Sequence, residues 1–182
     1  MGVTLIGGGV RSGKSRFGLE LGRKRFANGA FIATGEARDA EMAERIRRHQ
    51  AERGPNWTTI EEPLDLAGAI EGASTRFGGC VVDCLTLWLS NVMLSPAHDV
   101  DKEIGRLMGV LEAGGATGII LITNEVGCGI VPESELARRY RDLAGGLNQR
   151  VAALADEVYW MAFGVPVDVK ALRPRDLTQG SV

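Results

Sequence analysis

The sequence has few aromatic residues, cysteines and histidines, and no long hydrophobic run. Of 182 residues only 5% are aromatic, and there are three cysteines and two histidines. Three cysteines make no even disulfide framework and no CxxC pair, which suits a reducing compartment. We expect Cys80 and Cys84, which flank a strand-like segment, to be small buried hydrophobic residues rather than metal or redox groups.

Membrane signals are missing as well. The apolar runs stay far below the roughly 20 residues that a membrane-spanning helix needs. The opening stretch MGVTLIGGG has neither a charged segment nor the long apolar segment of a signal peptide. We therefore expect a cytoplasmic protein without a membrane span.

Neither sign of charge predominates. Lys and Arg number 21 against 23 Asp and Glu, and the net charge is −2. Nucleic-acid surfaces need clustered cations, so we expect no nucleic-acid partner. Hydrophobic residues make up 45% and charged residues 24%, as in ordinary globular domains. The length favours one domain, which we place at 1–170, with a flexible tail at 171–182 that has no periodic pattern.

Short apolar runs alternate with helical stretches along the chain. Buried strands are predicted at 3–6, 31–34, 80–85 and 118–123, whereas residues 57–62 alternate only weakly. Predicted helices cover 14–26, 40–53, 64–76, a stretch around Trp88 and Met93, 99–113 and 134–155. EVYWMA and VPVDVK, on either side of Gly164, are expected to form a hairpin. This alternation predicts an α/β fold, with a mostly parallel sheet, helices on both faces and a C-terminal hairpin.

A phosphate-loop motif follows the first predicted strand. The stretch GGVRSGKS fits GxxxxGK[ST], and it has a strand before it and a helix after it. Backbone N–H groups of such a loop surround phosphate oxygens, while Lys14 would reach the terminal phosphates and the Ser15 hydroxyl would help to hold Mg²⁺. A glycine-rich turn with a fortuitous lysine is the alternative. The predicted nucleotide-binding residues of the loop are Gly8, Gly9, Val10, Arg11, Ser12, Gly13, Lys14 and Ser15.

A phosphate-loop site also needs a carboxylate near the magnesium ion, at the end of a neighbouring strand. Asp83, in VVDCL, is placed for that role. It could equally cap the following helix, and one role does not exclude the other. These residues predict a nucleotide-dependent enzyme or switch protein and nothing finer.

His49 lies in the charged stretch EMAERIRRHQAERG. On a helix, Met42, Ile46, His49 and Arg53 share one stripe, so the imidazole points toward the protein. A lone histidine on such a stripe is commonly a partly buried structural residue. A neutral imidazole can also attack phosphorus and form a phosphoramidate, with nearby arginines stabilising the developing charge. Both interpretations stay open on this pattern alone.

Several stretches together resemble one family. They are GGGVRSGKS, FIATGEARDAEMAERIRRHQAERGPNW, VVDCLTLWLSN, LITNEVGCGIVPESELARRYRDLAGGLNQRVA and DEVYWMAFGVPVDVK. Over about residues 3–170 they are similar to the bifunctional adenosylcobinamide kinase/adenosylcobinamide-phosphate guanylyltransferases of cobalamin biosynthesis. The TNEVGxGIVP and LARxxRDLAGxxNQ runs are far more specific than the phosphate loop. The resemblance implies a RecA-like P-loop NTPase core and a homotrimer.

The resemblance also implies an activity. Such enzymes phosphorylate adenosylcobinamide with ATP or GTP, then transfer GMP from GTP to adenosylcobinamide phosphate, releasing pyrophosphate. The transfer passes through a guanylylated histidine, and the matching residue here is His49. Lys14 is the other implied catalytic residue, and Ser15 and Asp83 are the implied Mg²⁺ ligands. Beyond the loop, the implied GTP contacts are Ala33, Thr34, Gly35, Gln50, Ala51, Glu52, Arg53, Glu61 and Asp83.

Some residues and functions keep more than one interpretation. Glu125, Arg138 and Arg139 are candidates for substrate or subunit contacts, although a strand-end carboxylate and a solvated helix face are slightly favoured. From its pattern alone, Glu61 is typical of a solvated strand end. The rival functions are a P-loop small-molecule kinase without covalent nucleotide and a nucleotide-dependent switch protein.

Overall fold

A computed structural model describes residues 2–35, 56–114 and 117–172. Its centre is a seven-stranded sheet in which all neighbouring strands run parallel except the last two. In spatial order the strands are β3 (Trp57–Glu61), β2 (Gly29–Ala33), β4 (Gly79–Asp83), β5 (Gly118–Ile122), β1 (Val3–Gly8), β6 (Glu157–Ala162) and β7 (Val165–Asp168). The predicted mostly parallel α/β sheet is confirmed.

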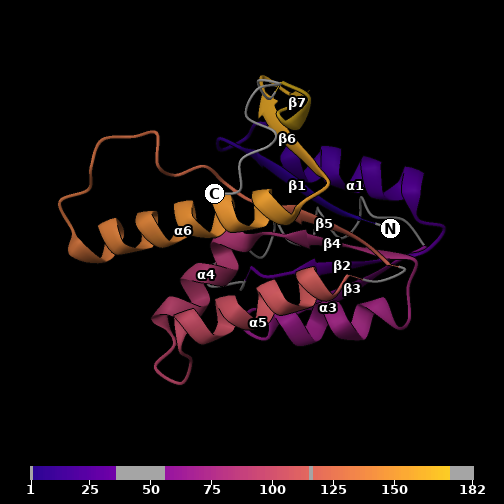
Figure 1. Ribbon diagram of the computed structural model, residues 1–182, viewed down its shortest axis with the longest axis horizontal. Coiled ribbons are helices and arrows are strands. Elements are labelled where there is room, and N and C mark those ends of the chain that lie inside the picture. Colours follow the sequence, from indigo (N-terminus) through magenta and orange to yellow (C-terminus); the bar gives the residue numbers. More distant parts are fainter. Residues whose placement is uncertain (1, 36–55, 115–116, 173–182) are drawn as a thin grey trace, which may run out of the picture.

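Helices cover both faces of the sheet (Figure 1). On one face lies α1 (Lys14–Arg25), and on the other lie α3 (Leu66–Ser74), α4 (Leu85–Leu94), α5 (Val100–Ala113) and α6 (Glu135–Leu154). Alternate residues of β1 serve the two layers, since Val3 and Leu5 join the core under α3–α6 while Ile6 joins the core under α1. Strands buried on both faces need apolar residues at every position, which is why they read as continuous apolar runs.

Aspartate side chains cap two of the helices on the face opposite α1. Asp65 accepts a hydrogen bond from the Gly68 amide at the start of α3, and Asp99 accepts one from the Lys102 amide at the start of α5. Each such cap satisfies an amide that has no partner within the helix, and its removal typically costs about 1 kcal/mol. These caps fix where the helices begin relative to the sheet.

The predicted elements match the described part of the chain closely. The four predicted buried strands correspond to β1, β2, β4 and β5, and the predicted hairpin is β6–β7. The weakly alternating stretch 57–62 contains β3, which pairs with β2 on one side only and is incompletely buried. The helix predicted at 40–53 lies outside the described residues. Residues 173–182 of the predicted tail also lie outside them. Lys170–Leu172, where that tail begins, form a short 3-10 helix. Among the described helices, none is long and apolar enough to cross a membrane.

The cysteines differ in burial, and this predicts their reactivity. Cys80 and Cys84 are buried, as expected, while Cys128 is exposed. Burial raises the pKa of the Cys80 thiol to about 12. Burial, with the Asp83 carboxylate adding to it, also raises the pKa of Cys84. Since the thiolate is the nucleophile, an aromatic disulfide reagent at about pH 8 should label Cys128 within minutes and the other two only after denaturation. Rapid labelling of more than one thiol in the folded protein would contradict this.

Candidate nucleotide site

The phosphate loop joins the carboxyl end of β1 to α1, in the strand–loop–helix arrangement that the motif requires. Gly13 is the N-cap of α1 with φ of 93°, and Gly8 has φ of 144°. A Cβ atom at Gly8 would lie 2.9 Å from the Met161 carbonyl oxygen. Glycine is therefore required at the point where the backbone turns toward the helix N-terminus.

Substitution of these glycines should have unequal effects. Gly8→Ala meets both a left-handed backbone and the Met161 carbonyl, so it should lower the free energy of unfolding by about 1–3 kcal/mol and weaken nucleotide binding. Gly9→Ala is the matched control because its Cβ would have nothing within 4 Å. Urea denaturation gives the free energy of unfolding of both variants. Equal stability of Gly8→Ala and Gly9→Ala would contradict the close approach to Met161.

Lys14 is held over the loop. The residue is 7% exposed, and Nζ donates to the Gly9 carbonyl at 2.6 Å and to the Ser12 hydroxyl at 3.4 Å. A buried ammonium group is costly unless it is hydrogen-bonded. The loop carbonyl supplies such a bond, and it keeps the positive charge beside the amides of the loop. Ser15 follows in the first turn of α1.

The other predicted contacts lie along the same edge of the sheet. The register pairs Glu61 of β3 with Ala33 of β2, and Ala33 with Asp83 of β4. Continuing across the sheet, Asp83 pairs with Ile122 and Ile122 with Ile6, two residues before the loop begins at Gly8. This row is the carboxyl edge of the parallel strands, where open α/β sheets bind their ligands. Glu61 lies at its far end, on the edge strand.

Thr34 joins two strand ends. It is fully buried, its amide donates to the Asp83 carbonyl at 3.2 Å, and its hydroxyl both donates to the Cys84 carbonyl and accepts from the Cys84 amide, at 2.7 and 2.8 Å. The Asn91 side chain in turn donates to the Thr34 carbonyl at 2.8 Å. These bonds hold the end of β2 against that of β4, and so position Asp83. Sequence analysis did not predict a role for Asn91. The signal that could have identified it is an asparagine within an otherwise apolar helix.

A second polar network holds the segment after β5. The Asn124 side-chain nitrogen donates to the Thr86 hydroxyl at 2.7 Å, and the Thr123 hydroxyl donates to the Asn148 side-chain oxygen at 2.7 Å. Asn148 also donates to the Asn124 carbonyl at 3.2 Å, and the Tyr140 hydroxyl donates to the Thr86 carbonyl at 3.0 Å. Helices α4 and α6 thereby fix the exit of β5 beside the phosphate loop. Sequence analysis missed all five residues, although two polar residues directly after a buried strand are a usable signal.

Glu125 lies next to the loop but is used locally. Its amide donates to the Gly8 carbonyl at 3.2 Å, and its carboxylate accepts from the Gly127 amide at 2.6 Å. The first bond ties the TNEVG segment to the end of β1. The second closes a tight turn, in keeping with the structural interpretation of this carboxylate.

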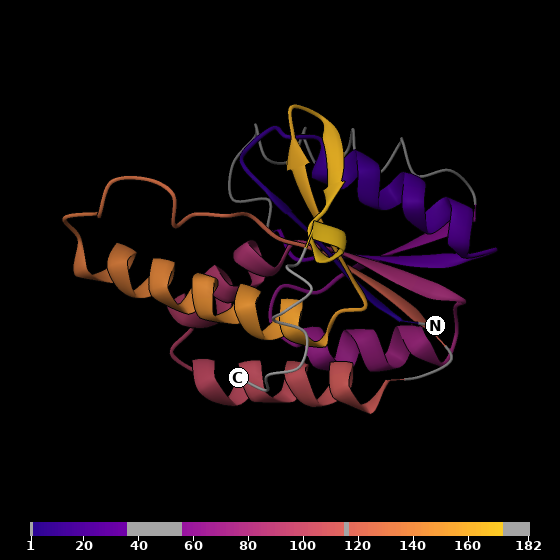
Figure 2. The same ribbon diagram turned by 45° about the horizontal axis from the view of Figure 1, so that its top comes forward.

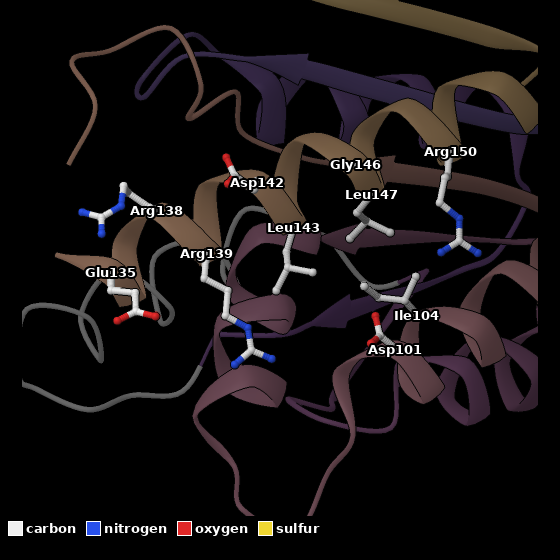
Figure 3. A pocket seen from close by; sticks show the side chains of 10 residues that line it. All are labelled: Asp101, Ile104, Glu135, Arg138, Arg139, Asp142, Leu143, Gly146, Leu147 and Arg150. Carbon is white, nitrogen blue, oxygen red and sulfur yellow. The ribbon is translucent and has the colours of Figure 1, made fainter. Parts of the chain in front are cut away.

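Arg138 and Arg139 line a groove of about 610 Å³ between α5 and α6 (Figure 3). Its floor includes Ile104, Leu143 and Leu147. Both helices lie on the face of the sheet opposite α1, so this groove is separate from the phosphate loop. The Arg138 guanidinium donates to the carbonyls of Pro132 and Glu133, at 3.1 and 2.6 Å, and so fixes the segment before α6.

The predicted nucleophile cannot be placed in this geometry. His49 and the implied contacts Gln50, Ala51, Glu52 and Arg53 lie outside the described residues. Within the ranges that the structure does describe, no group of three or more His, Cys, Asp or Glu side chains could hold a metal ion.

Comparison with known proteins supplies the family. A family described as cobinamide kinase / cobinamide phosphate guanyltransferase matches residues 4–169. The chain belongs to this family. A relative in Pseudomonas aeruginosa, the bifunctional adenosylcobalamin biosynthesis protein CobP, is 42% identical over 168 residues, which cover 91% of this chain and 96% of the relative. The protein CobU of Escherichia coli, with the same description, is 36% identical over 182 residues, or 92% of this chain and 99% of CobU.

A solved structure agrees on the fold. An ATPase from the type III secretion system of pathogenic bacteria superimposes with a TM-score of 0.55 at 12% identity, covering 92% of this chain and 56% of the ATPase. At such low identity the likeness bears on architecture alone, and it agrees with the α/β fold that the sequence predicted. The family match spans nearly all of the described sheet, from β1 to β7.

Proposed function

We propose that this chain catalyses two successive reactions of cobalamin biosynthesis. In the first, the γ-phosphoryl group of ATP or GTP is transferred to the hydroxyl of adenosylcobinamide. In the second, GMP from GTP is transferred to adenosylcobinamide phosphate, giving adenosylcobinamide-GDP and pyrophosphate. Membership of the cobinamide kinase / cobinamide phosphate guanyltransferase family over residues 4–169 is the observation that carries this proposal.

The phosphate loop would serve both reactions. Its amides and Lys14 lie together at the N-terminus of α1, where an anion is stabilised by the helix dipole and by a nearby cation. In the kinase step these groups stabilise charge on the transferred phosphoryl group, and in the transfer step they stabilise the departing pyrophosphate. One binding loop thus suits two reactions at different phosphorus atoms of a triphosphate.

Magnesium fits the donors available at this edge. We assign its protein ligands to the Ser15 hydroxyl and the Asp83 carboxylate, at the start of α1 and the end of β4. Mg²⁺ prefers hard oxygen donors and commonly binds through one or two protein ligands together with substrate phosphates and water. When bound, it would neutralise charge on the terminal phosphates.

Replacement of Asp83 tests this assignment. Asp83→Asn keeps the size of the side chain but removes its charge, so it should raise the Mg²⁺ concentration needed for half-maximal kinase activity about tenfold or more. Glu20→Gln, which removes the carboxylate of an exposed ion pair with Arg16 on α1, is the control and should behave as wild type. An unchanged Mg²⁺ requirement in Asp83→Asn would show that the ion is held elsewhere.

Guanylyl transfer would use His49 as a covalent nucleophile. A ring nitrogen attacks the α-phosphorus of GTP, so that an N–P bond forms, the bond from the α-phosphorus to the bridging oxygen breaks, and pyrophosphate leaves with the electron pair. The phosphate oxygen of adenosylcobinamide phosphate then attacks the same phosphorus, and the N–P bond breaks to restore the imidazole. Because only neutral imidazole has an electron pair for the attack, transfer should decline as the pH falls.

The remaining predicted GTP contacts include residues at the carboxyl ends of the strands. Ala33, Glu61 and Asp83 share one register line, which supports contacts to GTP along this edge, and Gly35 lies just beyond it. Since Thr34 is buried and its hydroxyl is engaged by Cys84, we assign it to positioning the edge. Gln50, Ala51, Glu52 and Arg53 follow the nucleophile and are proposed as further GTP contacts.

We also propose a cytoplasmic homotrimer. The support is the family resemblance, together with a described part of the chain in which no helix could cross a membrane. Light scattering on the purified protein tests the assembly, and a monomer at micromolar concentration would rule it out.

Identification of the corrinoid products tests the proposed function. Purified protein is incubated with adenosylcobinamide, Mg²⁺ and GTP, and the corrinoids are separated and identified by mass spectrometry. Adenosylcobinamide phosphate should appear first and adenosylcobinamide-GDP later, with pyrophosphate released in step with the second product. Accumulation of the phosphate alone would indicate a plain P-loop kinase, whereas GTP hydrolysis without any corrinoid product would favour a switch protein.

A further inference from the structure

The turn between β6 and β7 carries a phenylalanine where the fold favours another residue. Ala162 pairs with Val165, so Phe163 and Gly164 form a two-residue turn, with φ of 52° and 84°. Turns with two positive φ angles strongly favour Asn, Asp or Gly, and a large side chain is uncommon there. Phe163 is also 104% exposed, so no packing in the core accounts for it. An outlier that is both conformational and apolar suggests a function.

This turn lies against the phosphate loop. The pairing of β6 with β1 continues to Met161 opposite Gly8, the first residue of the loop. A Cβ atom at Gly13, the N-cap of α1, would lie 3.6 Å from the Cα atom of Gly164. Figures 1 and 2 show the hairpin rising beside α1 in both views. Phe163 is therefore next to Gly164, a residue that lies close to the loop that would bind the triphosphate.

The strand order indicates which way a bound nucleotide extends. Asp83, the proposed magnesium ligand, ends β4 on one side of β1, with β5 between them. The β6–β7 hairpin is on the other side of β1. Because magnesium binds the terminal phosphates, a nucleotide with those phosphates toward Asp83 has its nucleoside toward the hairpin.

We propose that Phe163 stacks on the purine base of the nucleotide that donates the γ-phosphoryl group. This inference rests on the proposed kinase step and names a specificity residue for it. A base stacked here cannot also reach Glu61, since β2, β4 and β5 separate β3 from β1. Phe163 is therefore assigned to the donor of the kinase step, whereas the contacts to GTP proposed along the other strand ends belong to the guanylyl-transfer step, in which GTP would extend from the loop toward β3.

The chemistry of the contact sets its specificity. An aromatic face stacks on any purine, because stacking reads the plane of the base and not the hydrogen-bonding groups on its edge. Phe163 therefore gives the kinase step affinity for a purine without a choice between adenine and guanine. ATP and GTP should both serve as donors, and both should depend on this side chain.

The test uses three variants of the full chain. Phe163→Ala removes the ring, Phe163→Asn removes it while installing a residue that the turn favours, and Phe163→Trp keeps an aromatic face. In the Ala and Asn variants, the KM for ATP and for GTP in adenosylcobinamide phosphorylation should rise about tenfold, with kcat within about twofold. The Trp variant should resemble wild type. The Asn variant should have a melting temperature at or above that of the wild type. Such a result would show that its higher KM does not come from misfolding.

A spectroscopic readout needs no corrinoid. Tryptophan emission of Phe163→Trp, corrected for the wild-type protein, should be quenched by the β,γ-imido analogues of ATP and GTP and not by inorganic tripolyphosphate. Equal emission with and without saturating analogue would overturn the stacking. Unchanged KM values for ATP and GTP in both the Ala and Asn variants would also overturn the stacking. The same holds if these variants change only the oligomeric state of the protein and leave the KM values unaltered. A wild-type protein that phosphorylates no adenosylcobinamide would instead refute the proposed function, and the emission experiment would still decide the role of Phe163.

Discussion

Replacing His49 with alanine is expected to lower guanylyl transfer at least about a thousandfold while leaving the phosphorylation of adenosylcobinamide nearly unchanged. The reason is that the two reactions use different nucleophiles. The α-phosphorus of GTP would be attacked by the imidazole, whereas the γ-phosphorus is attacked by the substrate hydroxyl. Separate assays, with adenosylcobinamide for the first step and adenosylcobinamide phosphate for the second, give kcat for each.

The other histidine of the chain is the control. The Nδ1 atom of His98 lies 3.5 Å from the Glu103 carboxylate beside the start of α5, on the face opposite the phosphate loop. His98→Ala should therefore keep both activities, with at most a small loss of stability. If His49→Ala loses both reactions while its fold remains intact, the division between two nucleophiles is wrong.

Replacing Lys14 with alanine should slow both reactions together. Its ammonium group is held by the Gly9 carbonyl at 2.6 Å, beside the loop that is proposed to bind the triphosphate. Removing one such electrostatic donor typically costs about 10²- to 10³-fold in rate, and both steps would share the loss. The measurements are kcat/KM of each step and the affinity for GTP by calorimetry.

Stability separates this effect from misfolding. Lys14 is a buried cation whose desolvation offsets much of its hydrogen bonding, so Lys14→Ala should unfold within about 1 kcal/mol of wild type. Lys24→Ala, near the end of α1, removes an exposed lysine from the same helix and should keep full activity. Wild-type kcat/KM for either step in Lys14→Ala would mean that the loop does not bind the reacting triphosphate.

The sequence predicted the elements of the fold better than their order. Strands such as β1 and β5 are buried on both faces, so nearly every position lacks a polar side chain and the pattern is clear. The edge strand β3 gave only a weak signal because it has a neighbour on one side and partly exposed side chains. The insertion of β5 between β1 and β4 depends on packing across the whole sheet, which no local pattern encodes.

The site was predictable where chemistry is local. The phosphate loop needs particular residues at fixed spacing, and the structure has the expected strand, loop and helix around Lys14. The alignment of Glu61, Ala33 and Asp83 in one row depends on the register between strands. The sequence therefore suggested Glu61 and Ala33 only through family resemblance, whereas Asp83 was also expected from its place at the end of a predicted strand. Phe163 gave no signal, because its backbone angle and its exposure exist only in the folded hairpin.

A search for nucleotide bound covalently to the chain tests the central claim most directly. The purified protein is incubated with Mg²⁺ and GTP labelled at the α-phosphate, then denatured and separated from free nucleotide. Label that stays on the chain, is released by acid, resists base and is missing from His49→Ala is the predicted result, since phosphoramidates have this stability. GTP binding with an intact fold and no retained label would contradict the covalent mechanism and return His49 to a structural role.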